Sequence, residues 1–517
     1  MSHLTKILTD GTTPSPFQAI STFLICIIVN ILWRVIYNLY FHPLSKFPGP
    51  KIAAITPLYE YYFDLFKHGM YIWEIEKMHA KYGPVVRFNP RELHIKDPLF
   101  YDEIYSPSAK KREKDAQFVA GFAAPGSMIA TVGHEQHRMR RGKVNNFFSK
   151  RSVMALEPMI RKKIGILITR LETEKIQGTE FRLNAVFAGL TADIITKYSF
   201  GRGTNYLTST ANSNDLQGAV DGASMLFHTL RIFPFLHTVI NIIPSWLMQK
   251  LEPQAAGFLA VRESIRQQCM ELLKDPASDT TSTPSIFDAL VDPEIPTEER
   301  TAGRLSDEGW IILAAGIETT GKALSTGMFH LLNNKSLLLR LRKELSEIMP
   351  TPTSQATWTQ IERLPLMNGV INESLRLSYS VTMRTPRISP TDPLAYNGLL
   401  IPPGTPVSQS IYFVLSDPTL FPDPDSFQPD RWIESDAEGK GLHRFLVAFG
   451  KGSRQCLGMN LALCELYMTM AHIVRRFDIE LHDTTSETIK VYRDLGLGYP
   501  KEGALRVMAK VVGSVES

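Results

Sequence analysis

The sequence has few cysteines and little excess charge, and both absences exclude classes of protein. Its 517 residues include four cysteines, Cys26, Cys269, Cys456 and Cys464. So few in a long chain make no disulfide framework and fit a reducing compartment. The formal net charge is +4, far from the concentration of Lys and Arg that nucleic-acid-binding domains show. Nucleic acid is therefore excluded as the main partner.

The sequence also lacks internal repeats, long low-complexity tracts and a glycine-rich dinucleotide fingerprint of the GxGxxG type in a βαβ setting. At 44% hydrophobic residues, it has the composition of a protein that buries a sizeable core. A redox enzyme with this sequence would need its electrons from another protein.

One long apolar run is present, at the N-terminus. Residues 17–41 carry a single charge, Arg34, whose side chain can snorkel to the membrane surface. About 20 mostly apolar residues span a bilayer. A cleaved signal peptide would end in small residues, whereas this run ends in bulky aromatics. We expect a retained transmembrane anchor after a short lumenal N-terminus, residues 1–16. Lys46 and Lys51 follow the anchor, so the positive-inside rule places the body in the cytosol.

The remainder predicts a mainly α fold with a small β portion. After a Pro-rich, extended connector over residues 42–57, one domain is expected over residues 58–517. Helical patterns cover Met154–Leu171, Phe258–Leu273, Ser306–Leu332, Met367–Leu377 and Met459–Phe477. Short strands are expected near Val85 and Leu93, and a hairpin with a glycine turn from Ala395. Residues 275–304, rich in Asp, Ser, Thr and Pro, predict a surface loop.

The most informative segment surrounds Cys456. It reads FGKGSRQCLG from Phe449, and an apolar helical pattern follows it. Two glycines permit a tight backbone path before the cysteine. The start of a helix lowers the pKa of a nearby thiol and favours thiolate. A lone cysteine after a glycine-rich loop is more often a buried, inert one.

The whole pattern Phe-x-x-Gly-x-Arg-x-Cys-x-Gly resembles the haem-binding signature of the cytochrome P450 family. The resemblance implies the P450 fold, haem b as cofactor and Cys456 as the thiolate ligand of its iron. Thiolate ligation promotes cleavage of bound O2. It also assigns Phe449 and Arg454 to the haem site, with Arg454 placed to pair with a propionate.

Further segments match the same family in the same order. Glu373 and Arg376 are three residues apart on a predicted helix, so their charges can meet. Alone, such a pair is more often solvated. The later segment FQPDRW is similar to the one that supplies a second arginine, which implies a structural triad of Glu373, Arg376 and Arg431.

The segment AGIETT resembles the oxygen-activation motif of the family. Ala315 and Gly316 would leave room for O2, and the hydroxyl of Thr319 can break an i−4 hydrogen bond of the helix. Glu318 and Thr319 form an acid–alcohol pair that can relay the two protons that O2 cleavage needs. Without Cys456, an ordinary helix with a solvated acid would be the better interpretation.

Three further basic residues are expected at the haem propionates, beside Arg454. His137 and Arg141 occupy the positions where the family usually has Trp-x-x-x-Arg, and histidine there is a departure. Arg387 sits where many members have another propionate-binding arginine. A basic surface patch is the alternative for the first two, and Arg138, Arg140 and Lys143 beside them suit an acidic redox partner.

The resemblance implies a monooxygenase that inserts one atom of O2 into an apolar small molecule, with electrons from NADPH through a membrane-bound NADPH–cytochrome reductase. It places the protein in the endoplasmic reticulum membrane. The membrane-proximal segment looks like that of fungal members, which implies secondary metabolism and a terpenoid-like substrate. The expected pocket residues are Phe118, Phe122, Val381, Thr382 and Met383, together with Ala315 and Thr319. A haem-thiolate isomerase or dehydratase that does not use O2, and a non-catalytic haem sensor, remain alternatives.

Overall fold

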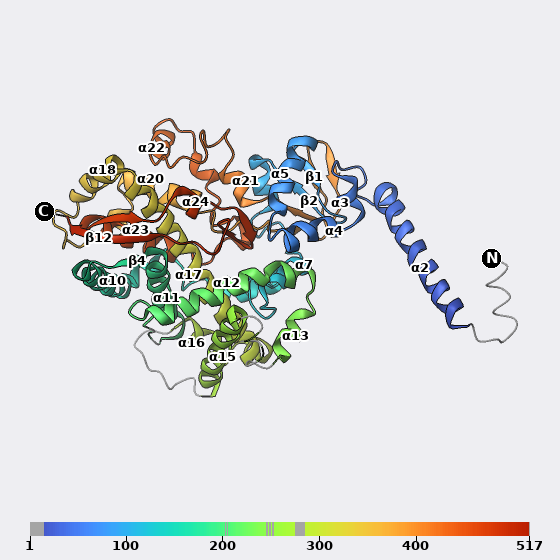
Figure 1. Cartoon of the computed structure of the whole chain (residues 1–517), viewed down its shortest axis with the longest axis horizontal. Helices are drawn as coiled ribbons and strands as arrows, with labels where there is room; N and C mark the ends of the chain where they lie inside the picture. Colours follow the sequence, from blue (N-terminus) through green and yellow to red (C-terminus); the bar gives the residue numbers. More distant parts are fainter. Residues whose placement is uncertain are drawn as a thin grey trace.

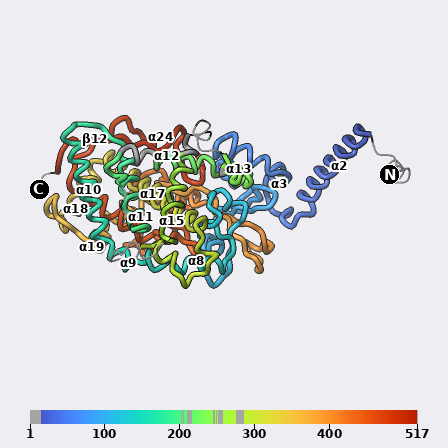
Figure 2. Tube along the Cα trace, turned by 90° about the horizontal axis from the view of Figure 1, so that it is seen from below, coloured from blue at the N-terminus to red at the C-terminus, as the bar shows by residue number. Residues whose placement is uncertain are grey.

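The N-terminal helix stands apart from the body of the molecule. The computed structural model describes residues 15–201, 203, 205–243, 247, 250, 253–274 and 285–515. Helix α2 (Pro16–Ile36) continues into η1 (Tyr37–Phe41) and projects away from the rest of the chain (Figures 1 and 2). No residue of either element is buried, and together they are long and apolar enough to cross a membrane. Most of the expected lumenal segment, residues 1–14, lies outside the described residues.

The body is mainly helical, as the sequence predicts. Its helices are α3 (Lys51–Ile55), α4 (Leu58–Tyr61), α5 (Tyr71–Tyr82), α6 (Tyr101–Ile104), α7 (Ala116–Val119), α8 (His134–Val144), α9 (Lys150–Ala155), α10 (Glu157–Gln177), α11 (Leu183–Phe200), α12 (Thr210–Ile232), α13 (Leu236–Ile242), α15 (Pro253–Lys274), α16 (Ile286–Leu290), α17 (Ala302–Asn333), α18 (Lys335–Ser346), α19 (Trp358–Ile361), α20 (Pro365–Ser378), α21 (Ile411–Leu415), α22 (Asp430–Ala437), α23 (Met459–Arg476) and α24 (Ser486–Ile489). Shorter turns are η2 (Tyr62–Phe66), η3 (Pro98–Phe100), η4 (Ala120–Phe122), η5 (Thr297–Glu299), η6 (Leu442–Phe445) and η7 (Gly452–Arg454).

Within the part of the chain that the structure describes, the strands form four small sheets. They are β1 (Val85–Arg87), β2 (Leu93–Ile95), β3 (Glu113–Lys114), β4 (Glu180–Arg182), β5 (Arg387–Ile388), β6 (Leu394–Tyr396), β7 (Leu399–Ile401), β8 (Pro406–Ser408), β9 (Phe477–His482), β10 (Arg493–Leu495), β11 (Leu497–Tyr499) and β12 (Met508–Ser514). The largest sheet has the order β1-β2-β8-β5-β3, in which only β2 and β8 pair in parallel. The others are β4-β12-β9, β10-β11 and the expected hairpin β6-β7.

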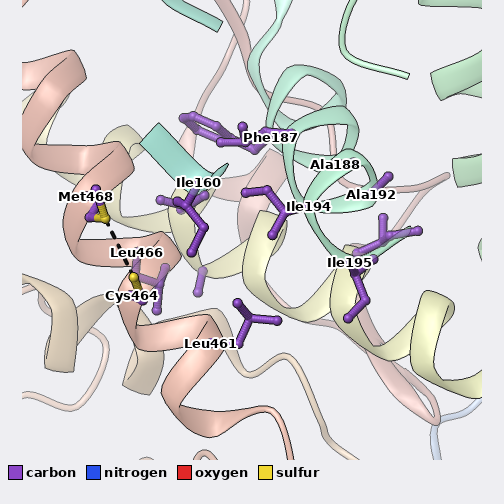
Figure 3. Close-up of a cluster of buried hydrophobic side chains, with 14 of the residues drawn as sticks. Ile160, Phe187, Ala188, Ala192, Ile194, Ile195, Leu461, Cys464, Leu466 and Met468 are labelled. Carbon is purple, nitrogen blue, oxygen red and sulfur yellow. Dashed lines mark hydrogen bonds between the residues drawn. The ribbon is translucent and has the colours of Figure 1, made fainter. Parts of the chain in front are cut away.

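Helix α17 runs through the helical part of the body and packs against α11, α15, α20 and α23. Every residue of α11 except Lys197 is buried. The core between these helices contains Ile194 of α11 and Leu461 of α23 (Figure 3). Cys464 is buried in this core and donates a weak hydrogen bond to the sulfur of Met468 at 3.6 Å (Figure 3). The apolar face of α23 therefore fixes the segment that precedes it, which holds Cys456.

Three local predictions were wrong. The helix expected over Met154–Leu171 is divided at Leu156 into α9 and α10, because Pro158 has no N–H to donate to the carbonyl four residues earlier. Within 275–304, Ile286, Phe287 and Leu290 of α16 are buried, and the ring of Phe287 stacks on Phe200 with centroids 4.4 Å apart. Residues 275–284 lie outside the described residues. The connector also contains α3, which begins directly after Pro50.

Candidate haem-thiolate site

The loop before α23 holds Cys456 in a fixed backbone path. Gly450 and Gly452 have φ of +62° and +73°, which favour glycine. A Cβ on Gly452 would collide with the carbonyl oxygens of Tyr105 and Ser106. The backbone N–H of Cys456 donates to the carbonyl of Phe449 at 2.9 Å. The glycines and this hydrogen bond thus set the direction of the cysteine.

The environment of the Cys456 thiol differs from the expectation. Burial raises the pKa of the thiol, and the backbone N–H of Gly458 and the charge of Arg141 only oppose this effect. The predicted depression of this pKa by the helix start was therefore wrong for the protein alone. Cys456 nevertheless keeps accessible surface, and a coordinated metal ion deprotonates a thiol outright.

A cluster of five basic side chains lies close to this loop. Arg141 donates to the carbonyl of Gln455 at 2.6 Å. Arg454 donates to the carbonyls of Thr131 and Val132 at 2.6 and 2.9 Å, and its Nε is buried without a partner. The cluster consists of Lys114, His137, Arg141, Arg387 and Arg454.

The pKa values of these groups show that positive charges dominate the cluster, although the carboxylate of Glu113 acts on Arg454. Burial, together with the charges of Arg454 and Lys114, lowers the pKa of His137 to about 2. Burial and then the charge of Arg387 lower the pKa of Arg454 to about 9. The pKa of Lys114 is lowered well below its ordinary value, again by burial and by the charge of Arg387. Like charges at this density call for an anionic partner, so the cluster fits a group with two carboxylates, such as haem with its two propionates.

Lys114 is the member of the cluster that sequence reasoning missed. Its side chain is buried and donates to the carbonyl of Ile129. It lies in the charged stretch KKREKD, residues 110–115, whose composition is typical of a solvated surface segment. The pairing of β3 with β5, which aligns Lys114 with Arg387, brings it inside. No local signal in the sequence indicates this pairing.

The motif on α17 forms an unbroken helix. The hydroxyl of Thr319 donates to the carbonyl of Ala315 at 2.8 Å, one turn earlier. Ala315 is exposed although the helix around it is largely buried. A Cβ on Gly316 would lie 3.1 Å from Ile195 of α11. Room for a small ligand is thus left at Ala315. Gly316 was expected to leave room for O2 as well, but its missing side chain instead allows the close approach of α11.

Glu318 is buried, contrary to the alternative of a solvated acid. Burial and the charge of Asp221, opposed by the charge of Lys322, raise its pKa to about 7. The carboxyl can therefore exchange a proton near neutral pH.

The three charges expected as a triad meet in the structure. Arg376 donates to both oxygens of Glu373 at 2.9 and 2.6 Å, and both side chains are fully buried. The Nε of Arg431 lies 3.2 Å from Glu373. Trp432 also donates to this carboxylate, at 3.0 Å. The group ties α20 to α22.

Four of the expected pocket residues share one apolar cluster. Phe118, Phe122, Val381 and Met383 pack together with Phe227 of α12. The rings of Phe118, Phe122 and Phe227 lie edge to face, with centroids 5.5–6.1 Å apart. Thr382 is different, because its hydroxyl donates to Asp494 at 2.9 Å and its side chain is buried. The place of Thr382 in the pocket wall stays a prediction.

The comparison with known families identifies the chain. The family model described as cytochrome P450 matches residues 50–505. The chain belongs to the cytochrome P450 family.

Its relatives are fungal P450 enzymes. It is 44% identical to the cytochrome P450 monooxygenase aflU of Aspergillus parasiticus over 497 residues, 96% of this chain and 99% of the relative. The conidiogenone synthase PchP450 of Penicillium rubens is 45% identical over 475 residues, 92% and 95% of the two chains. The cytochrome P450 monooxygenase TRI4 of Trichoderma arundinaceum is 40% identical over 481 residues, 93% and 92%.

These relatives decide between the alternatives left open by the sequence. The chain is a P450 monooxygenase, an oxidoreductase. Family membership implies a haem with thiolate ligation and the use of O2. It also implies a reductase partner and a small-molecule substrate.

Proposed function

We propose that this P450 binds haem b through the thiolate of Cys456 and inserts one oxygen atom into an apolar small molecule. The observation that carries the assignment is the basic cluster beside the Cys456 loop, with Arg141 bonded to Gln455 and its charge acting on the thiol. The residues that hold the propionates are Lys114, His137, Arg141, Arg387 and Arg454. The backbone carbonyl of Phe449 accepts a hydrogen bond from the N–H of Cys456 and so orients this cysteine, the iron ligand.

Haem held in this way activates O2 with two electrons and two protons per turnover. Ala315 leaves space beside α17 for the small ligand. Thr319 and Glu318 move the protons. The Thr319 hydroxyl orients the small ligand that accepts a proton, and the Glu318 carboxyl supplies that proton. The Glu373, Arg376 and Arg431 triad fixes the segment that leads to the Cys456 loop and takes no part in the chemistry.

The substrate is a polycyclic apolar molecule such as a terpenoid, oxidised in fungal secondary metabolism. The aromatic cluster of Phe118, Phe122 and Phe227 supports a large apolar ligand. The relative named conidiogenone synthase supports a biosynthetic role. Hydroxylation or epoxidation is the expected outcome.

Electrons come from NADPH through a membrane-bound NADPH–cytochrome reductase. Arg138 and Lys143 on α8 are exposed and suit an acidic partner. Arg140 does not, because it is buried and ion-paired with Glu299 at 2.8 Å. Its expected role in docking is therefore withdrawn.

The protein is placed in the endoplasmic reticulum membrane as a single-pass protein. Helix α2 with η1 is long and apolar enough to be the anchor expected over residues 17–41. Lys46 and Lys51, which follow the anchor, support a cytosolic side for the domain over residues 58–517, where the reductase delivers electrons. Residues 1–16 then face the lumen.

Turnover under isotopically labelled O2 tests this proposal. The full chain is combined with reductase in phosphatidylcholine vesicles, and polycyclic terpenes are first screened for a shift of the haem spectrum. With NADPH and labelled O2, the product should gain one labelled atom. Thr319→Ala should divert NADPH into peroxide, and the matched control Thr320→Val should not. Product formed without NADPH or O2 would contradict the proposal and favour an isomerase.

A further inference from the structure

Three ionisable groups that the proposed reaction does not otherwise use are buried with Glu318 where α17, α12 and β11 meet. Glu318 and Lys322 of α17, Asp221 of α12 and Tyr499 of β11 are each at most 8% exposed. Charged side chains are almost never buried to this degree unless they are paired. Their partners therefore show what the cluster does.

Lys322 is positioned by a backbone carbonyl. It lies one turn after Glu318 on the same face of α17, and its ammonium donates to the carbonyl of Gly498. The next residue, Tyr499, donates its hydroxyl to Asp221 at 2.8 Å. Two consecutive residues of β11 thus hold the buried lysine and the second buried acid.

The charges of the cluster are balanced for proton exchange. Burial raises the pKa of Asp221, and the Tyr499 hydrogen bond and the charge of Arg182 oppose this rise. Burial lowers the pKa of Lys322 to about 8, and Glu318 opposes it. Tyr499 stays neutral because burial raises its pKa. Two buried acids beside one buried ammonium favour one carboxylate and one carboxylic acid.

The cluster extends from Thr319 toward the outside of the body. Glu318 precedes Thr319 in the sequence. At the other end, Arg182 of β4 is only half-buried and donates to Gln217 of α12 at 3.5 Å. The charge of Arg182 acts on both Asp221 and Glu318. The outer acid, Asp221, and the inner acid, Glu318, therefore both respond to the charge of Arg182.

We propose that Lys322 is a positioning residue that keeps one transferable proton on the Glu318–Asp221 pair, beside Thr319. This inference rests on the proposed roles of Glu318 and Thr319. Glu318 gives the proton of the pair toward Thr319 and becomes a carboxylate that Lys322 stabilises. Asp221 then takes up a proton from the solvent side at Arg182 and passes it to Glu318, so the pair again carries one proton. One proton moves inward, and Lys322 keeps its charge throughout.

Infrared titration of the Glu318 carboxyl tests the charge couple without turnover. The haem-loaded full chain is titrated between pH 5 and 9, and the band lost in Glu318→Gln identifies this group. Lys322→Met should raise the midpoint by about 1–3 pH units, because it removes the opposing charge. Asp221→Asn should lower the midpoint, because it removes a like charge. Lys322→Arg should restore the wild-type value, and Lys335→Met on the exposed face of α18 should leave it unchanged.

Opposite shifts in the first two variants support the proposal, and a midpoint unchanged by Lys322→Met overturns it. Asp221→Asn keeps the test decisive if Lys322→Met folds poorly, since an upward shift there would also overturn it. Failure of the underlying function shows differently. If Glu318→Gln consumes NADPH with the solvent isotope effect of the wild type, Glu318 does not deliver protons, whatever its titration.

Discussion

Two arginine–carboxylate pairs with similar geometry but different burial allow a direct test of what holds the haem-side segment. Arg376 meets Glu373 at 2.9 and 2.6 Å with both side chains fully buried. Arg340 meets Asp430 at 3.0 and 2.6 Å with the side chains 52% and 43% exposed. Each arginine is replaced by alanine.

The expected losses differ several-fold. Removing one partner of a buried pair costs about 3–5 kcal/mol. Arg376 also donates to the carbonyls of Leu415, Pro424 and Ser426 at 3.1, 2.6 and 3.0 Å, which its loss leaves without this donor. Glu373 keeps Trp432 and the charge of Arg431, so we expect the lower end of the range. An exposed pair contributes about 0.2–1 kcal/mol after solvent screening.

Urea unfolding of the two variants measures this difference. The midpoint is followed by fluorescence, and the haem content of the purified protein is measured beside it. Arg376→Ala should show a large fall in midpoint and poor haem loading, because domains have only about 5–15 kcal/mol of stability in total. Arg340→Ala should stay close to the wild type. Equal losses in the two variants would refute the argument that burial determines the energetic role of the triad.

Three further perturbations follow from the geometry. Gly452→Ala should abolish haem loading, because the added Cβ collides with backbone oxygens. Gly450→Ala places its Cβ with nothing within 4 Å, so it should cost only the strain of the positive φ, about 1–2 kcal/mol. Equal haem loading in the two variants, measured by haem absorbance, would contradict this. Burial lowers the pKa of His79 to about 4 from 6.5, and its ring contacts His94 at 2.7 Å. Its contribution is therefore present above pH 6.5 and lost toward pH 4, by about 2 kcal/mol at pH 5, and urea midpoints of His79→Asn should vary less between pH 7 and 5 than those of the wild type. Arg140→Ala should lower the melting temperature through its buried ion pair, and a variant that changes only the apparent affinity for reductase would contradict the buried assignment.

The features that the sequence predicted are those whose residues lie close together along the chain. The Cys456 loop spans ten residues, and its glycines predict the tight backbone path. Glu373 and Arg376 meet because one helical turn separates them. The long helix α17 and the hairpin β6-β7 follow from periodicity and from a turn at Asn397 and Gly398, both with positive φ.

The features that the sequence did not predict depend on pairing between distant segments. Lys114 enters the basic cluster only because β3 pairs with β5. Asp221 reaches the Glu318 region through Tyr499, 278 residues away along the chain. The pKa of Cys456 was mispredicted because local helix effects are outweighed by burial, which the whole fold determines. The hydrogen bond of Thr382 was likewise not predicted, since its partner Asp494 lies 112 residues away along the chain.

The most direct test of the central claim is the absorption spectrum of the reduced, carbon-monoxide-bound protein, recorded for the wild type and for Cys456→Ser. The control Cys464→Ser changes a buried cysteine of α23 away from the loop. Thiolate ligation by Cys456 predicts a Soret band near about 450 nm in the wild type and in the control, and its loss in Cys456→Ser. A band near about 420 nm in folded wild-type protein, or a band near 450 nm that survives in Cys456→Ser, would contradict the assignment of Cys456 as the iron ligand.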